Sequence, residues 1–245
     1  MNFIAHFVAA TRMLPAAAPL PLYVMANALP DLLPLAAPRV RLRPAMLDAA
    51  PQQTSQEAAI RAGVKAHLRT DEIFHKTRAF AEAAGEVGGL VDRAGFADMR
   101  VRRFFLAHVL TELALDAHLI RQEPELLDTF YAACADTDYE HVKRWAEAAT
   151  HRLLPDLPHT LTRFVHSQYL RHYATDGGVA EGFNRLCLRA RQDTFTGPNA
   201  ARLVTVTTKA AALMTKYAPA LLAETAAALH PSSAASGDNP PQSGC

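Results

Sequence analysis

The sequence contains little cysteine and almost no net charge. Its three cysteines, Cys134, Cys187 and Cys245, are too few and too widely spaced for a disulfide framework or a zinc ribbon. A reducing compartment, the cytoplasm, is therefore expected. The 25 Lys and Arg residues against 24 Asp and Glu residues give a net charge of +1. Because such a chain has no strong overall field, we expect no nucleic-acid partner.

The sequence also lacks a clear signal peptide or membrane-spanning run. Its apolar N-terminal stretch has no basic segment before it and is interrupted by His6 and Arg12. The uncharged run from Met13 to Pro30 contains four prolines, which disfavour a transmembrane helix. We therefore expect no membrane partner. Nothing in the sequence indicates the oligomeric state.

No segment shows the alternation of apolar and polar residues that is typical of a half-buried strand. The sequence therefore predicts an all-α protein. Half of the residues are hydrophobic, which is enough for one helical domain over residues 1–229. The Ser-, Gly- and Pro-rich residues 230–245 are expected to form a disordered tail.

The predicted helices follow the apolar periodicity and the positions of proline and glycine. Pro30 and Pro34 are expected to break or end a short helix, and the glycines at 85, 88 and 89 are expected to form a turn. The predicted helical ranges are 2–12, 22–33, 57–84, 98–121, 124–151 (as one helix or two), 159–174, 179–193 and 199–229.

Ionisable residues recur every four positions in the two long helices predicted over 57–84 and 98–121. The first carries His67, Asp71 and His75, and the second carries His108, Glu112 and Asp116. On a helix this spacing places three residues on one stripe about 80° wide. Both stripes face the apolar core, where a lone carboxylate is costly unless it is paired or bound to a metal.

Two explanations of these stripes remain open at this point. Imidazole and carboxylate groups suit Mn²⁺, Zn²⁺ or Fe, and a bound ion would activate water and polarise a phosphoryl oxygen. Lys65 and Arg69 flank the first stripe and would then assist with an anionic substrate, or would simply be exposed. A buried hydrogen-bond network also produces such stripes.

Ordered motifs occur at Met1–His6, Asn27–Asp31 and Gly63–Asp71 and around Tyr169 and Gly178. They resemble motifs of the acyl carrier protein phosphodiesterase family, which is grouped with the HD-type metal-dependent phosphohydrolases. Met1–His6 is similar to the family's Met-Asn-Phe-Leu-Ala-His, and Asn27–Asp31 to its Gly-Asn-x-x-x-Asp. Gly63–Asp71 is similar to its Gly-Ile-x-x-His-Arg-x-Ile-Asp, and the segments around Tyr169 and Gly178 to its C-terminal motif. The resemblance is collinear over about residues 1–191.

The resemblance implies an HD-like helical fold and a Mn²⁺-dependent enzyme. Such an enzyme hydrolyses the phosphodiester that joins 4′-phosphopantetheine to a serine of acyl carrier protein, a small acidic partner. The positions that carry over are His6, Asn27, Asp31, His67 and Asp71. The arginines at 39, 41 and 43 would suit an acidic carrier.

This sequence departs from the family pattern at other positions. The family has Asp where His75 stands, and its Asp-x-x-x-Asp-His aligns with the segment from His108 through Glu112 to Leu113. The new side chains can still bind metal. Three alternatives follow: a carrier-protein phosphodiesterase, an HD-like hydrolase of another phosphoester, or a family member that binds without catalysis.

The predicted site combines the helical spacing of the ionisable residues with the family resemblance. Asp31, Lys65 and Arg69 are the candidate catalytic residues, and Asn27 and Asp116 are expected to line the site. The predicted metal ligands are His67, Asp71, His108 and Glu112, followed by His6 and His75. We expect the four leading ligands to lie within reach of one point.

Overall fold

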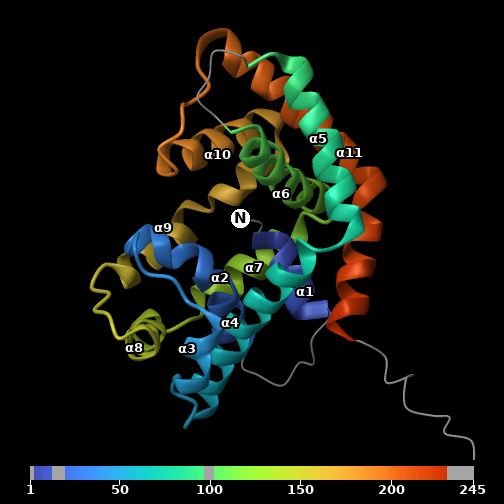
Figure 1. The fold of residues 1–245 in the computed structure, drawn as a ribbon. Helices are drawn as coiled ribbons and strands as arrows, with labels where there is room; N and C mark the ends of the chain where they lie inside the picture. The colour runs from blue at the N-terminus through green and yellow to red at the C-terminus, as the bar shows by residue number, and fades with distance from the viewer. Residues whose placement is uncertain (1–2, 13–19, 97–101, 231–245) are drawn as a thin grey trace, which may run out of the picture.

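The computed structural model describes residues 3–12, 20–96 and 102–230, and it confirms the all-α prediction (Figure 1). These residues form no strand. Of the tail predicted at 230–245, residues 231–245 lie outside the described residues. The helices are α1 (Phe3–Arg12), α2 (Leu20–Ala36), α3 (Pro44–Ala49), α4 (Ser55–Phe74), α5 (Arg78–Ala94), α6 (Arg103–Gln122), α7 (Glu125–Ala135), α8 (Tyr139–Thr150), α9 (Leu157–Ser167), the 3-10 helix η1 (Tyr169–Ala174), α10 (Asp176–Arg189) and α11 (Gly197–Leu229).

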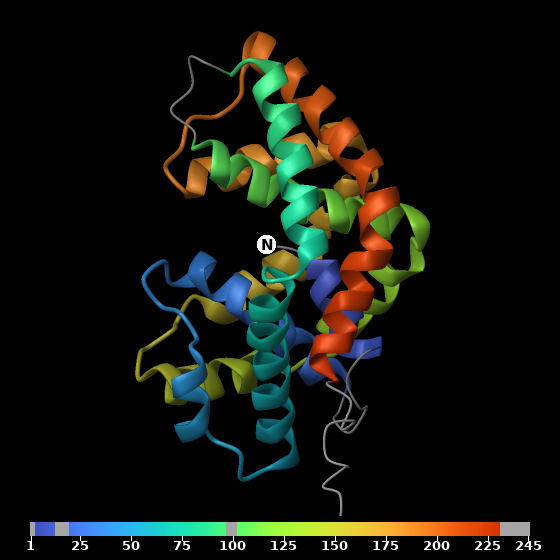
Figure 2. The same cartoon turned by 45° about the vertical axis from the view of Figure 1, so that its right-hand side comes forward.

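The helices pack around one apolar core that includes residues from Phe3 to Leu221. Helix α2 packs along α4, and the long helix α11 runs beside α5 and also contacts α4 and α6 (Figures 1 and 2). The short N-terminal helix α1 lies among α2, α4 and α6. Within the described residues, no helix combines the length and apolar character that crossing a membrane requires.

Helix α4 ends earlier than the sequence predicts. Thr54 and Glu57 form a capping box at its start, but the helix stops at Phe74, and His75 occupies its C-cap. The Thr77 side chain then accepts a hydrogen bond from the backbone N–H of Phe80 and caps α5. The single helix predicted over 57–84 is therefore wrong, because a new N-cap begins a second helix. The glycines predicted to form a turn lie inside that second helix.

Two prolines predicted to interrupt a helix are instead contained in α2. This helix continues through Pro30 and Pro34 to Ala36. An internal proline costs about 3 kcal/mol, because it removes a hydrogen bond and crowds the preceding turn. Leu29, Leu32 and Leu33 of the same helix are fully buried, and burying one such side chain contributes about 1.5–3 kcal/mol. Burial of α2 in the core therefore offsets the local cost.

A glycine allows α2 and α4 to approach closely. A Cβ atom added at Gly63 would lie 2.4 Å from the carbonyl oxygen of Tyr23 and 2.9 Å from Cβ of Ala26. At the same crossing, Nδ2 of Asn27 donates a hydrogen bond to the carbonyl oxygen of Gly63 at 3.4 Å. Since Gly63 precedes His67 by one turn, this crossing fixes where the first ionisable stripe lies.

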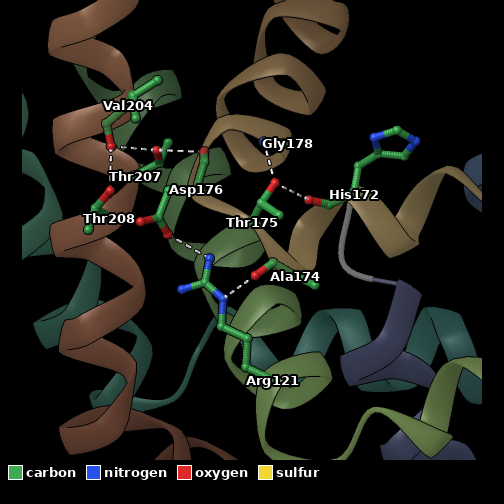
Figure 3. Close-up of polar contacts among 9 residues, drawn as sticks. All are labelled: Arg121, His172, Ala174, Thr175, Asp176, Gly178, Val204, Thr207 and Thr208. Carbon is green, nitrogen blue, oxygen red and sulfur yellow. Dashed lines mark hydrogen bonds and ion pairs between the residues drawn. The ribbon is translucent and has the colours of Figure 1, made fainter.

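Polar contacts connect the C-terminal end of α6 to η1 and α10, and connect α10 to α11 (Figure 3). Nε of Arg121 donates to the carbonyl oxygen of Ala174 at 3.0 Å, and its Nη2 lies 2.6 Å from Oδ1 of Asp176. The Thr175 hydroxyl caps α10, and the Thr207 hydroxyl donates to the carbonyl oxygen of Asp176 at 3.4 Å. These contacts fix α6, which carries the second ionisable stripe.

Candidate metal centre

Helix α1 brings His6 to the site, and a buried carboxylate holds the start of this helix. Asp116 accepts hydrogen bonds from the backbone N–H groups of Ala5 at 2.9 Å and Ile4 at 3.2 Å. Burial raises the pKa of Asp116 to about 7, although both hydrogen bonds lower it. Asp116 was predicted to line the site, and its two oxygens face the backbone of α1. It therefore orients the helix that carries His6.

The first cluster consists of His6, His67 and Asp71. One potential ligand atom from each residue lies within 4.8 Å of the other two. Nε2 of His6 is 3.6 Å from Oδ1 of Asp71, and the two imidazole rings stack with centroids 4.0 Å apart. Both histidines are buried, and Nδ1 of each has no hydrogen-bond partner among the described residues. Buried polar atoms of this kind are rare, and they indicate that a bound water, an ion or a catalytic role is involved.

The protonation states of this cluster favour metal binding. Burial, followed by the nearby His6, lowers the pKa of His67 to about 4. Burial raises the pKa of Asp71, but the hydrogen bond with His6 and the electrostatic interactions with His6, His75 and His67 outweigh it, so this pKa lies below its ordinary value. Near pH 7 the His67 imidazole is neutral and the Asp71 carboxylate is ionised, which are the forms that ligate a metal.

The second cluster consists of His75, His108 and Glu112, and its potential ligand atoms also lie within 4.8 Å of one another. Oε1 of Glu112 is 2.7 Å from Nε2 of His75 and 3.1 Å from Nε2 of His108. Burial raises the pKa of Glu112, yet contacts that include both imidazoles bring it well below its ordinary value. Burial lowers the pKa of His75, but the hydrogen bond with Glu112 leaves it raised.

The two clusters adjoin each other. Oδ1 of Asp71 lies 3.7 Å from Nδ1 of His75, one helical turn later. The four leading ligands predicted to converge on one point are thus divided, because His67 and Asp71 belong to the first cluster and His108 and Glu112 to the second. Helix α1 completes the first set with His6, and the C-cap of α4 completes the second with His75.

Each cluster contains two imidazoles and one carboxylate. Three protein ligands of this type leave positions open for water or substrate, as in catalytic zinc sites and in non-haem iron centres. Each cluster could therefore hold a divalent metal ion. The identity of the ion stays a prediction.

Asp31 lies near the first cluster but outside it. Its half-buried side chain is on α2. Its charge partly opposes the burial that lowers the pKa of His67, and adds to the burial that raises the pKa of Tyr169. Asn27, on the same helix, contacts the backbone of Gly63 as described above.

Lys65 and Arg69, the other two candidate catalytic residues, point elsewhere. Both are exposed and lie about 200° around α4 from His67. Nη2 of Arg69 donates to the carbonyl oxygen of Leu229 at the end of α11, at 2.8 Å. The structure therefore does not bring these two side chains to the clusters.

The sequence reasoning missed a cavity of about 960 Å³, whose lining includes Val109 of α6, the residue after His108. Its lining comes from α2, α6, α9, η1 and α10, with Pro38 and Arg41 between α2 and α3 and Ala190 directly after α10. Because these segments are far apart in the sequence, periodicity within single helices could not reveal the cavity. Comparison of this chain with protein-family models, with curated proteins and with solved structures gives no match.

Proposed function

We propose that this chain is a metal-dependent hydrolase of phosphodiesters. The supporting observation is the pair of adjoining clusters, each with two imidazoles and one carboxylate, joined through Asp71 and His75. Charged and imidazole groups buried together are typical of functional sites. We expect Mn²⁺ first, with Zn²⁺ or Fe as alternatives.

The residues around the clusters suit phosphoester hydrolysis. A bound divalent ion would supply an acidified water and positive charge for a phosphoryl oxygen. His6, His67 and Asp71 would hold one ion, and His75, His108 and Glu112 a second. Asp31 belongs to neither cluster and lies within electrostatic reach of His67, so we assign it the role of proton acceptor.

The proposed substrate is the holo form of an acyl carrier protein. The resemblance of Met1–His6, Asn27–Asp31 and Gly63–Asp71 to the acyl carrier protein phosphodiesterase family supports this choice. The scissile bond would be the phosphodiester between 4′-phosphopantetheine and the carrier serine. Hydrolysis of another phosphoester by an HD-like site is the alternative within the same chemistry.

The test is an assay of purified protein equilibrated with Mn²⁺. We expect release of 4′-phosphopantetheine from holo-carrier, detected by mass spectrometry, and at least a 100-fold loss of rate in His67→Ala and Glu112→Gln. The matched control His159→Ala changes an exposed histidine of α9 outside both clusters and should retain the wild-type rate. Hydrolysis of bis(p-nitrophenyl) phosphate without carrier cleavage would support the alternative substrate. No hydrolysis of either compound by protein of verified metal content would refute the proposal.

One observation favours a second candidate, a binding scaffold without catalysis. Oε1 of Glu112 is already within hydrogen-bond distance of both His75 and His108, so the second cluster can satisfy itself without an ion. Under this alternative, Mn²⁺ would not raise the melting temperature, whereas a functional metal centre requires a rise.

A further inference from the structure

The cavity beside Val109 has an apolar lining. Its main apolar members come from α2, α6, α9 and α10, and they are Leu35, Phe105, Val109, Phe164 and Leu186. All of these except Phe164 are only partly buried, so their apolar surface remains accessible to a ligand. A volume of about 960 Å³ is at the upper end of the range typical of small-molecule sites.

Four arginines also line this cavity: Arg41, Arg163, Arg185 and Arg189. Arg185 pairs with Glu181, and Arg41 donates to backbone carbonyl oxygens. Arg163 and Arg189 form no ion pair with any described residue. No carboxylate among the described residues lines the cavity. Its charged groups are therefore all cationic, and only one of the four has an anionic partner.

We propose that this cavity binds an amphipathic phosphate, a molecule with an apolar chain that carries a phosphate group. The guanidinium group presents its donors in a planar fork that matches phosphate oxygens. The apolar lining removes the chain from water, and Arg163 and Arg189 receive the charge. Neither a free phosphate nor a neutral chain would use both features.

This inference does not rest on the proposed hydrolysis. None of the six cluster residues lines the cavity, although Val109 follows His108 on α6. Loss of metal should therefore leave ligand binding intact. Failure of one proposal is thus distinguishable from failure of the other.

The experiment measures binding of octyl phosphate, inorganic phosphate and octanol by titration calorimetry with full-length protein in the presence of EDTA. We expect octyl phosphate to bind at least tenfold more tightly than either of the others. The double variant Arg163→Gln/Arg189→Gln should lose at least tenfold in affinity for octyl phosphate. The matched control Arg152→Gln changes an exposed arginine that does not line the cavity and should bind as the wild type does.

A second variant, Leu186→Glu, places a carboxylate in the lining and should weaken binding at least as much. Melting curves verify that each variant is folded. The proposal is overturned by equal affinity for octyl phosphate and octanol, or by unchanged binding in the double variant. It is also overturned if EDTA or His67→Ala abolishes binding, because the ligand then occupies the metal clusters. Binding of octanoate as tight as that of octyl phosphate would refute selection of phosphate.

Discussion

Oδ1 of Asp71 lies 3.7 Å from Nδ1 of His75, and this contact connects the two clusters. The residues are one turn apart at the end of α4. One side of Asp71 also faces His6, whose Nε2 is 3.6 Å away. The carboxylate therefore lies between one imidazole from each cluster.

The first prediction concerns metal stoichiometry. We expect two Mn²⁺ ions per wild-type chain after equilibrium dialysis, measured by elemental analysis. His67→Ala and His108→Ala should each retain one ion, because each removes a ligand from a different cluster. The double variant should retain none, and His159→Ala should retain two. A single ion in the wild type, lost in both single variants, would show that the clusters share one site.

The second prediction concerns the pH dependence of stability in metal-free protein. Burial lowers the pKa of His67 to about 4 in the folded state, whereas an unfolded histidine titrates near 6.5. The folded state thus binds fewer protons, and stability is lost as the pH falls from about 6.5 to 4. A shift of this size corresponds to about 3 kcal/mol. Urea unfolding in the presence of a chelator should show that His67→Gln loses less stability than the wild type over this pH range. Equal losses in both proteins would contradict the pKa shift.

The third prediction concerns Asp116, the residue that holds α1. Asp116→Ala leaves the backbone N–H groups of Ile4 and Ala5 without their acceptor. An unsatisfied buried donor costs about 1–3 kcal/mol, so we expect a loss of about 2–5 kcal/mol in the free energy of unfolding. The exposed Asp48→Ala is the control and should change it by less than about 0.5 kcal/mol. Similar effects of both substitutions would refute this role.

The fourth prediction concerns the effect of Asp116 on the pH dependence of stability, which is opposite in sign to that of His67. Burial raises its folded pKa to about 7, above the unfolded value near 3.9. The folded state then binds more protons between these values, and stability falls as the pH rises from about 4 to 7. Asp116→Asn cannot titrate and should remove this decrease. Urea unfolding of both metal-free proteins at several pH values provides the comparison, and an unchanged slope would contradict the prediction.

The fifth prediction compares two glycines. Gly63→Ala would force a methyl group against the carbonyl oxygen of Tyr23, so we expect a loss of about 1–3 kcal/mol in stability. Gly85 lies inside α5, and an added Cβ would meet nothing within 4 Å. Gly85→Ala should therefore stabilise the protein by up to about 1 kcal/mol. Thermal unfolding measures the change in stability of each variant. Equal changes in the two variants would show that the close crossing of α2 and α4 does not make Gly63→Ala destabilising.

The local sequence pattern predicted the two ionisable stripes, but not how their residues divide into two clusters. His67, Asp71, His108 and Glu112 were identifiable because a spacing of four has a direct meaning on a helix. The division into two clusters depends on His6 approaching from α1 and on α4 ending at Phe74, which are tertiary features. The pattern also could not anticipate that core packing retains two prolines within α2.

Proximity in the sequence did not predict which basic side chains lie near the site. Lys65 and Arg69 are each two positions from His67, yet a helix turns by about 200° over that interval and directs them away. By contrast, the arginines of the cavity come from segments as far apart as Arg41 and Arg189. No local spacing relates these two positions, so only the packed structure brings them together.

The order in which the site residues occur along the chain has a consequence for protein synthesis. His6, His67 and Asp71 all lie within the first third of the sequence, whereas Asp116, which anchors the helix bearing His6, is made later. Helix α11, which contacts α1, α4 and α6, is made after all three of them. A nascent chain therefore carries all three side chains of the first cluster before it has the framework that holds them, so tight metal binding should follow completion of the fold.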